Sequence, residues 1–365
     1  YEIDATIVEK INGDAYTCPV FSSKTEFDFV IGFVENGKRF GDGISWNMQY
    51  GAMIHMAGDS VHFKTFDELS ESGLNIDSQD FLWKDSHDDI KYLPLYEAKL
   101  FDAFNPRYGD FRPIQNDKKF GVKAQPARPQ TSELKDRNWS PHPRYWVPVV
   151  LRNDWLKKRN DPAPNIGRVA TRDICRGLVE SRSLKSCVLP YDAALGHTAN
   201  YWLAPNDDPN LPWILSSILN SLVVDFQARM KLTGMHLSKY LQEQLFLPTP
   251  EKLRDTYVYV DGAHQDSAWN QLLGISRALH TEWVHLEHPL ELVPVWLQNE
   301  KNPMAILDVI VAKVMGVNEE KFDWLLNQFP IWERQLGEEV FRNERKLWFN
   351  RIEIIRSRED AEKIT

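Results

Sequence analysis

The chain has 365 residues, of which 42% are hydrophobic and 26% are charged, as in soluble globular proteins with one large domain or two to three ordinary ones. We find no signal peptide and no apolar run near the ~18 residues that a membrane helix needs, and we expect a cytoplasmic protein. The net charge of −9 argues against a uniformly basic nucleic-acid-binding protein.

The charge is distributed unevenly along the chain. Residues 1–100 carry 8 Lys and Arg against 18 Asp and Glu, a net of −10. Residues 101–185 carry 18 against 9, a net of +9. Because contact with phosphate needs only one positive face, this basic block is compatible with nucleic-acid binding.

The chain begins at Tyr1 in the middle of a pattern, and we interpret it as a fragment or a processed chain. Its cysteines are odd in number and have no metal-ligand spacing: Cys18, Cys175 and Cys187. We expect them to be reduced, as in a cytosolic protein.

The first hundred residues predict short elements separated by turns. Residues 17–30 predict an extended piece followed by a helix with Ser22 or Ser23 as its cap, and Ile44–Ala52 predicts a strand. His55, Asp59 and His62 have intervals that a metal site could use. A loop cap at Asp59 before a short helix explains them better, and we predict no metal site.

Residues 93–108, LPLYEAKLFDAFNPRY, contain three candidate polar contacts, Glu97, Lys99 and Arg107. The sequence leaves two interpretations of these residues open. In the first they contact DNA or the catalytic domain, and in the second they form a Glu–Lys–Arg network that fixes a loop. Residues 109–143 are rich in Pro, Lys, Arg and Gln without periodicity, and they predict a long loop insert.

The basic block then predicts strands at Tyr145–Leu151 and Leu184–Leu189, with a strand or short helix at Thr171–Cys175 between them. Its cations are interspersed with Trp146 and Trp155 and are candidates for phosphate contact. These candidates are Arg144, Arg152, Lys157, Lys158, Arg159, Arg168, Arg172, Arg176, Arg182 and Lys185. The alternative for the run at 157–159 is a solvated group of charges.

Residues 211–250 form the most informative local pattern. Apolar residues at intervals of three and four predict an amphipathic helix from Leu211 to Met230, and Gly234 is a stop signal. A second short helix is predicted at 236–245, before the stop at Pro248. We expect Arg229, Lys231, His236 and Lys239 to join the DNA-binding face, although the first two could merely complement the dipole of their own helix.

After Pro250 the pattern is mostly helical, with helices expected at 266–285, 303–315, 318–328 and from 338 onward. The predicted fold class is therefore mixed α/β. We expect an α/β domain at 1–250 with the insert at about 109–143, and a helical domain at 251–365.

Several of these segments, in order, resemble the C-terminal target-recognition half of N6-adenine DNA methyltransferases of the type IIG, type ISP and BREX phage-exclusion kinds, a TaqI-like specificity region. The family patterns "LPLYEGKMi..FdhRy", "W…f..MfhMtnDS..F.t" and "LNS…D…R.K..G.hL…QLP.P" match residues 93–108, 46–69 and 219–250. Ala98 stands where the family has Gly, and Asn105-Pro106 stands near its Asp-His.

The resemblance implies double-stranded DNA, an upstream methyltransferase domain and other subunits of a restriction-modification or phage-defence system as partners. The chain contains neither a glycine-rich S-adenosylmethionine loop nor an Asn/Asp-Pro-Pro-Tyr/Phe corner. We therefore expect no catalytic residues and no cofactor in this chain, with S-adenosylmethionine bound by the upstream domain. The alternative function is a scaffold that docks partner subunits without DNA specificity of its own.

Overall fold

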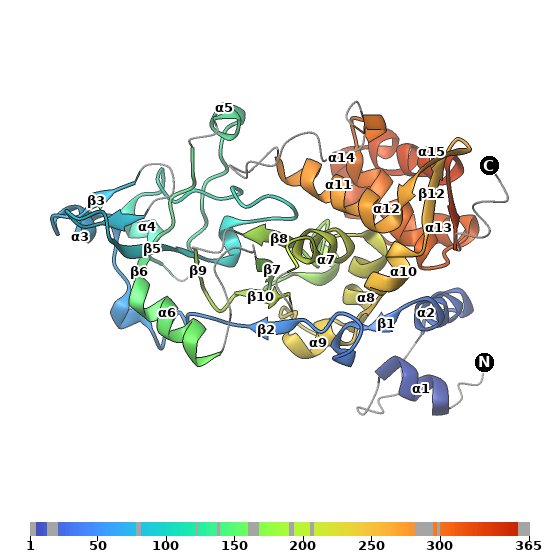
Figure 1. Cartoon of the computed structure of the whole chain (residues 1–365), viewed down its shortest axis with the longest axis horizontal. Helices are drawn as coiled ribbons and strands as arrows, with labels where there is room; N and C mark the ends of the chain where they lie inside the picture. Colours follow the sequence, from blue (N-terminus) through green and yellow to red (C-terminus); the bar gives the residue numbers. More distant parts are fainter. Residues whose placement is uncertain are drawn as a thin grey trace.

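The computed structural model describes residues 5–12, 21–77, 82–121, 123–136, 139–159, 168–189, 193–204, 208–281, 295–297 and 300–356. The fold is mixed α/β with helices concentrated towards the C-terminus, which confirms the predicted fold class. Figure 1 shows two lobes, one mostly of loops and short strands and one mostly of helices, on either side of a small central sheet.

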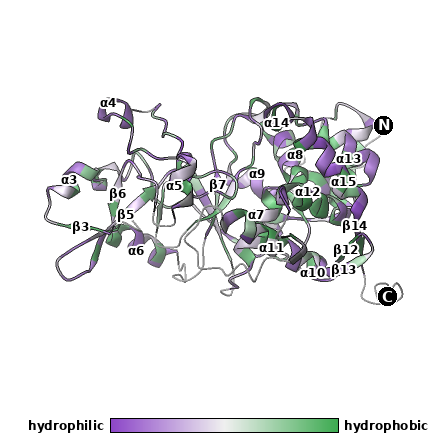
Figure 2. Cartoon of the chain, turned by 90° about the horizontal axis from the view of Figure 1, so that it is seen from above, coloured by the Kyte–Doolittle hydropathy of each residue, from purple (hydrophilic) through white to green (hydrophobic). Residues whose placement is uncertain are grey.

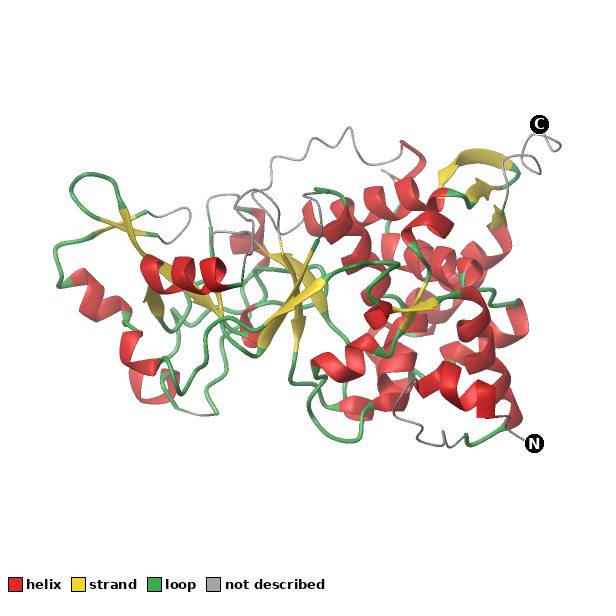
Figure 3. Ribbon diagram, turned by 60° about the horizontal axis from the view of Figure 1, so that its bottom comes forward, coloured by secondary structure: helices red, strands yellow, loops and turns green. Residues whose placement is uncertain are grey.

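The central sheet separates two hydrophobic cores. It is antiparallel, in the order β2-β10-β7-β8, and consists of β2 (Gln49–Gly51), β10 (Ala199–Leu203), β7 (Arg168–Arg172) and β8 (Ser186–Leu189). Successive residues of a strand point to opposite faces, so Val169 and Trp202 lie in one core while Ala170 and Tyr201 lie in the other. The sheet is therefore buried on both faces, and Figure 3 shows its strands in yellow in the middle of the molecule.

The left lobe in Figure 1 is built around β5 (Ile90–Tyr96), which pairs with β4 (Trp83–Lys84) and β6 (Trp146–Pro148) and, in parallel, with β9 (Ala194–Leu195). Strand β3 (Asn75–Ile76) completes this sheet. Its helices are α3 (Phe66–Ser70), α4 (Asn116–Lys119), α5 (Thr131–Lys135) and α6 (Val149–Lys158), with 3-10 turns at Ser60–His62 and Ala98–Leu100. A further 3-10 turn, Gly177–Val179, lies beside α8 (Leu222–Lys231), which holds the loop that follows it.

The right lobe packs its helices around one core that runs from Phe29 to Ile352. Helix α12, which is coloured hydrophobic in Figure 2, lies inside it. The helices are α2 (Lys24–Asn36), α7 (Leu211–Leu219), α8 (Leu222–Lys231), α9 (Lys239–Glu243), α10 (Pro250–Arg254), α11 (Ala268–Thr281), α12 (Pro303–Val314), α13 (Glu319–Leu326), α14 (Pro330–Leu336) and α15 (Glu344–Arg351). Helix α1 (Ala5–Asn12) and the strand pair β1 (Lys38–Arg39) and β11 (Phe246–Leu247) complete this end.

The predicted helix over 211–230 is two helices. Asn220 ends α7, and the Ser221 hydroxyl caps α8 by accepting a hydrogen bond from the Val224 N–H at 3.4 Å. All nine residues of α7 are buried, because the central sheet packs against one side of the helix and α11 packs against another. Among the described helices none alone is long and apolar enough to cross a bilayer; α7 and α8 pass that test only as a pair bent by 64°.

The region after 250 contains a sheet that the sequence prediction missed. Strands β12 (Tyr257–Val260), β13 (Ala263–Ser267) and β14 (Ile352–Ile355) form an antiparallel sheet in the order β13-β12-β14. The final helical segment starts with a π-helical turn at Glu339–Asn343 and continues as α15, and β14 follows directly. Leu247 and Leu253 belong to the same hydrophobic core, so packing continues across the predicted boundary at residue 250.

Other predicted elements are partly confirmed. Ser23 caps α2 by accepting from the Glu26 N–H at 3.1 Å, whereas residues 13–20 lie outside the described part. The strand predicted at Tyr145–Leu151 is only β6, because the chain turns into α6 directly after Pro148. The helix predicted at 236–245 is only α9, since His236 pairs in a bridge with Ile174. Cys175 and Cys187 are buried free thiols.

Candidate nucleic-acid interface

Two of the predicted DNA contacts instead hold the insert at 109–143. Lys99 Nζ donates to the Ala124 carbonyl at 2.7 Å, and burial lowers the pKa of this amine. The Arg107 guanidinium donates to the carbonyls of Leu134, Asp136 and Trp139 at 2.6 to 2.9 Å. Both side chains therefore donate to backbone carbonyls of the insert.

Arg144 fixes the same insert from the other side. Its Nε and Nη2 form a bidentate pair with Glu97 at 2.7 and 2.5 Å, and its Nη1 donates to the carbonyls of Lys119 and Gly121 at 3.2 Å. Burial opposes the charge of Arg144, but Glu97 outweighs it and raises the pKa of the guanidinium. The loop-fixing interpretation of this network is therefore the one that the structure supports, with Arg144 rather than Lys99 as the partner of Glu97.

Three more candidates, Arg152, Arg168 and Arg182, are buried among hydrophobic side chains. The Arg168 guanidinium lies 5.5 Å from the ring centre of Tyr201, and that of Arg182 lies 4.4 Å from the ring centre of Trp332. Burial lowers the pKa of Arg182 despite nearby Asp225. In this fold these three cations are at most 9% exposed, which leaves little of them available to a phosphate.

Arg172 and Lys185 lie together around one carboxylate. Lys185 Nζ is 3.3 Å and Arg172 Nη1 is 3.7 Å from Asp102 Oδ2, and Lys185 also pairs with Glu180 at 3.5 Å. Burial of Asp102 opposes its charge, but Lys185 and Arg172 outweigh that effect and lower its pKa. Much of the positive charge of the block at 101–185 is neutralised in this way by carboxylates within the fold.

Arg229 does not face solvent. It is 9% exposed, its Nε donates to Asp225 Oδ2 at 2.9 Å, and its Nη2 donates to the carbonyls of Glu180 and Ser181 at 3.2 and 2.7 Å. Its guanidinium also lies 4.3 Å from the ring centre of Phe329. Arg229 therefore anchors the loop at 180–184 and is not placed to hold a phosphate.

Lys231, His236 and Lys239 also have partners. Lys231 Nζ donates to Gln244 Oε1 at 3.3 Å, and burial lowers its pKa to about 8. His236 and Lys239 are more exposed, and they pair with Asp173 at 2.6 Å and with Glu243 at 3.3 Å. Arg176, which is 67% exposed, lies 3.9 Å from Glu180.

The exposed cations of the predicted set that remain are Lys157, Lys158 and Arg159, at the end of α6. The Arg159 guanidinium lies 5.1 Å from the ring centre of Trp155, which packs against the left-lobe core. Within the described part of the chain no carboxylate forms an ion pair with these three residues. They are therefore the predicted candidates best placed to meet a polyanion.

Sequence reasoning missed a second group of cations at the surface, which we call the insert surface: Lys118, Lys119, Lys123 and Arg128, of which Lys119 is partly exposed. Lys118 and Lys119 end α4, and the Arg128 guanidinium stacks over Tyr108 at 3.6 Å from the ring centre. The described residues show no ion pair for them either. The charge count over 101–185 includes these residues, but the insert has no periodicity and predicted only a long loop.

The histidines and carboxylate near residue 55 have structural partners. Asp59 accepts a hydrogen bond from the His55 backbone N–H at 2.7 Å, and the His55 ring stacks on His197 at 4.6 Å. Burial and then His55 lower the pKa of His197. Among the described residues, no three His, Cys, Asp or Glu side chains lie close enough together to hold a metal ion.

No protein-family model matches the chain, and no curated protein sequence matches it. The functional interpretation therefore depends on the geometry of the described surfaces and on the motif resemblance. The two cationic groups of the left lobe, the insert surface and the end of α6, are the candidate interface.

Proposed function

We propose that this chain is the DNA target-recognition region of an N6-adenine DNA methyltransferase of a restriction-modification or phage-defence system. In this proposal the chain binds duplex DNA, and a separate methyltransferase domain binds S-adenosylmethionine and carries out the methyl transfer. The ordered series of motif matches from residue 46 to residue 250 supports the family assignment.

The observation that carries the proposal is the position of the unneutralised positive charge. The protein is acidic overall, yet the insert surface and the end of α6 present seven Lys and Arg at the surface of the left lobe. Phosphate oxygens need such donors, and a local positive surface attracts DNA even when the net charge is negative. Trp155 and Tyr108, stacked beneath Arg159 and Arg128, restrict these side chains and reduce the entropy lost on binding.

The test uses the chain joined to the methyltransferase domain that the proposal requires. Binding to a fluorescent duplex is measured by anisotropy from 50 to 200 mM salt. For Lys157→Ala, Lys158→Ala and Arg159→Ala combined, we expect weaker binding to every sequence and a salt slope lower by about 0.9 per lost phosphate contact. The combined alanine variant of the insert surface should behave in the same way, with the recognised sequence unchanged in both.

A matched control removes three exposed lysines from the right lobe, Lys24, Lys38 and Lys301, and should leave the slope unaltered. Equal slopes for this control and for the α6 variant would show that simple net charge, and not these surfaces, governs binding. Absence of DNA binding at the lowest salt would overturn the proposed function and favour the subunit-docking scaffold.

A further inference from the structure

Strand β14 lies at the edge of its sheet. In the order β13-β12-β14, one side of β14 pairs with β12, and no described strand pairs with the other side. The edge of a strand presents a row of backbone N–H and C=O groups that can pair with a further chain. The question is whether this edge is blocked or left accessible.

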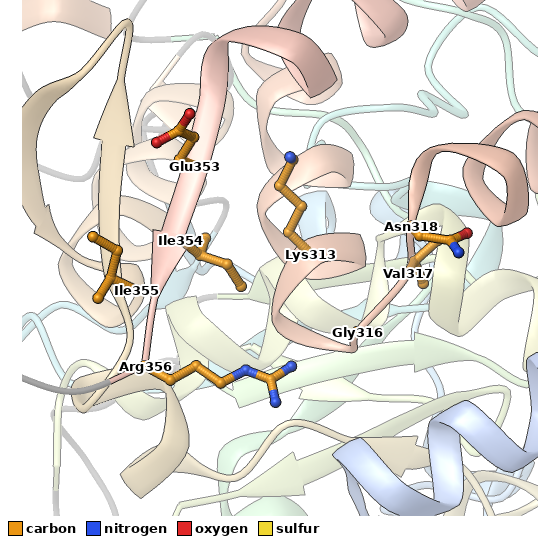
Figure 4. Close-up of a pocket in the computed structure, with 8 residues that line it drawn as sticks. All are labelled: Lys313, Gly316, Val317, Asn318, Glu353, Ile354, Ile355 and Arg356. Atoms are coloured by element: carbon orange, nitrogen blue, oxygen red, sulfur yellow. The ribbon is translucent and has the colours of Figure 1, made fainter. Parts of the chain in front are cut away.

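Figure 4 shows that an open groove runs beside β14. One wall is the strand from Glu353 to Arg356, and the other is the end of α12 with the turn that leads into α13. The groove has a volume of about 520 Å³. Gly316 makes this turn with φ of 74°, and a Cβ there would lie 2.6 Å from the Asn36 side chain, so the tight turn requires glycine.

The groove is flanked by cations. Lys313 and Arg356 line the groove from opposite walls, and Glu353 of β14 also lines it with a carboxylate. Just outside the groove, Lys252 Nζ donates a hydrogen bond to the Asn36 backbone carbonyl at 2.6 Å. Arg356 Nη2 donates one to Asn36 Oδ1 at 3.1 Å. Burial lowers the pKa of Lys313, and burial together with Arg356 lowers that of Lys252 to about 8. Two cations, Lys313 and Arg356, therefore line the groove against one carboxylate, Glu353.

We propose that this groove binds an acidic, extended peptide segment of a partner protein, which adds to the free edge of β14 as a fourth strand. Backbone hydrogen bonds to β14 supply affinity, and Lys313 and Arg356 select carboxylate side chains. Ile354 points into the groove in Figure 4 and offers an apolar contact for the peptide. This site lies in the right lobe and does not depend on the proposed DNA-binding function.

The free edge of β14 favours a single added strand as the occupant, since no described strand pairs with this side. A peptide that pairs with β14 would lie about 4.8 Å from it. Since β14 has four residues, the paired part of the peptide is short, and its charges must contribute much of the specificity.

The test compares two fluorescent eight-residue peptides, one alternating Glu and Val and one alternating Lys and Val. Anisotropy should show that the Glu/Val peptide binds and that the Lys/Val peptide binds at least tenfold more weakly. This preference is diagnostic because the net charge of −9 would by itself attract the basic peptide. Amide hydrogen exchange of residues 352–356 should slow when the Glu/Val peptide is bound.

Charge reversal provides the matched controls. Lys313→Glu with Arg356→Glu should weaken binding of the Glu/Val peptide at least tenfold, and Arg356→Glu alone tests the groove without changing half-buried Lys313. Lys301→Glu, an exposed site away from the groove, should change affinity less than twofold. The proposal fails if the Glu/Val peptide does not bind, if both peptides bind equally, or if exchange at 352–356 is unchanged. Protection of these amides that rises with protein concentration alone would instead identify a second copy of this chain as the occupant.

Discussion

Arg229→Ala separates the structural role of this side chain from the phosphate contact that the sequence predicts. Asp225 is fully buried, and it accepts hydrogen bonds from the backbone N–H groups of Ser183 and Leu184 at 2.8 and 2.5 Å as well as from Arg229. Removing the guanidinium leaves this carboxylate buried beside two amides but without its cation. Breaking a buried pair from one side costs about 3–5 kcal/mol of folding free energy, and we expect a loss in this range.

The assay combines urea denaturation with hydrogen exchange. We expect Arg229→Ala to lower the free energy of unfolding and to speed exchange at the amides of Ser183 and Leu184, while the salt slope of DNA binding stays unaltered. Lys231→Ala is the matched control from the same helix, since Lys231 makes one hydrogen bond to Gln244, and it should cost about 1 kcal/mol or less.

A stability loss below about 1 kcal/mol for Arg229→Ala would refute the assignment of Arg229 as an anchor. A salt slope lowered by about 0.9, at unchanged stability, would instead support the direct phosphate contact.

Two further predictions concern buried polar groups. The Asn220 side chain accepts a hydrogen bond from the Ser186 N–H at 3.0 Å and donates one to the Ser186 carbonyl at 2.8 Å. Asn220→Leu leaves both backbone groups unpaired, so urea denaturation should show that the free energy of unfolding falls by about 1–3 kcal/mol for each group. A fall of less than about 1 kcal/mol would mean that these groups find other partners. Burial lowers the pKa of His142 from 6.5 to about 3, so the unfolded chain takes up a proton between these values while the folded protein does not, and stability falls as pH drops from 6.5 towards 3. His142→Phe should flatten this part of the stability–pH curve, and an equally steep curve in the variant would contradict the assignment.

Caps, strands and helices that depend on residues close together in the sequence were predicted from local signals. The Ser23 cap, the strand before Pro190 and the helices after residue 300 follow from spacing and capping residues, and the structure confirms them. The break at Asn220 was missed because it depends on Ser186, which is 34 residues away and satisfies the Asn220 side chain. Strand β14 was missed because its four residues follow a helix without a turn signal and are stabilised by pairing with β12.

The candidate interface was predicted less well than the fold, for a related physical reason. A count of Lys and Arg does not reveal which cations pair with a carboxylate in the fold. Arg144 pairs with Glu97, 47 residues away, and Lys185 pairs with Asp102, 83 residues away. Arg229 pairs with Asp225, only four residues away. Even the close pair at 225 and 229 could not be recognised, because its burial depends on Phe329 and the loop at 180–184. The run at 157–159, for which a solvated group of charges was the alternative, is the predicted group that stays exposed without an ion pair among the described residues.

The central sheet has a consequence for how one lobe of this fold could be exchanged. Strands β2 and β7 flank β10, and both Gly51 and Ala170 lie opposite Tyr201, so the chain leaves for the left lobe and returns about 10 Å apart. A short linker of about three residues could span this gap in place of the intervening segment, residues 52–167. That segment also pairs with the later chain, through β5 with β9 and through Asp102 with Lys185. Deleting the segment would expose the face of the sheet that carries Cys187 and Leu189. It would also remove Phe104 from the core of the helical body, where its ring lies 5.2 Å from that of His280. A replacement lobe would therefore have to cover this face of the sheet and fill the position of Phe104.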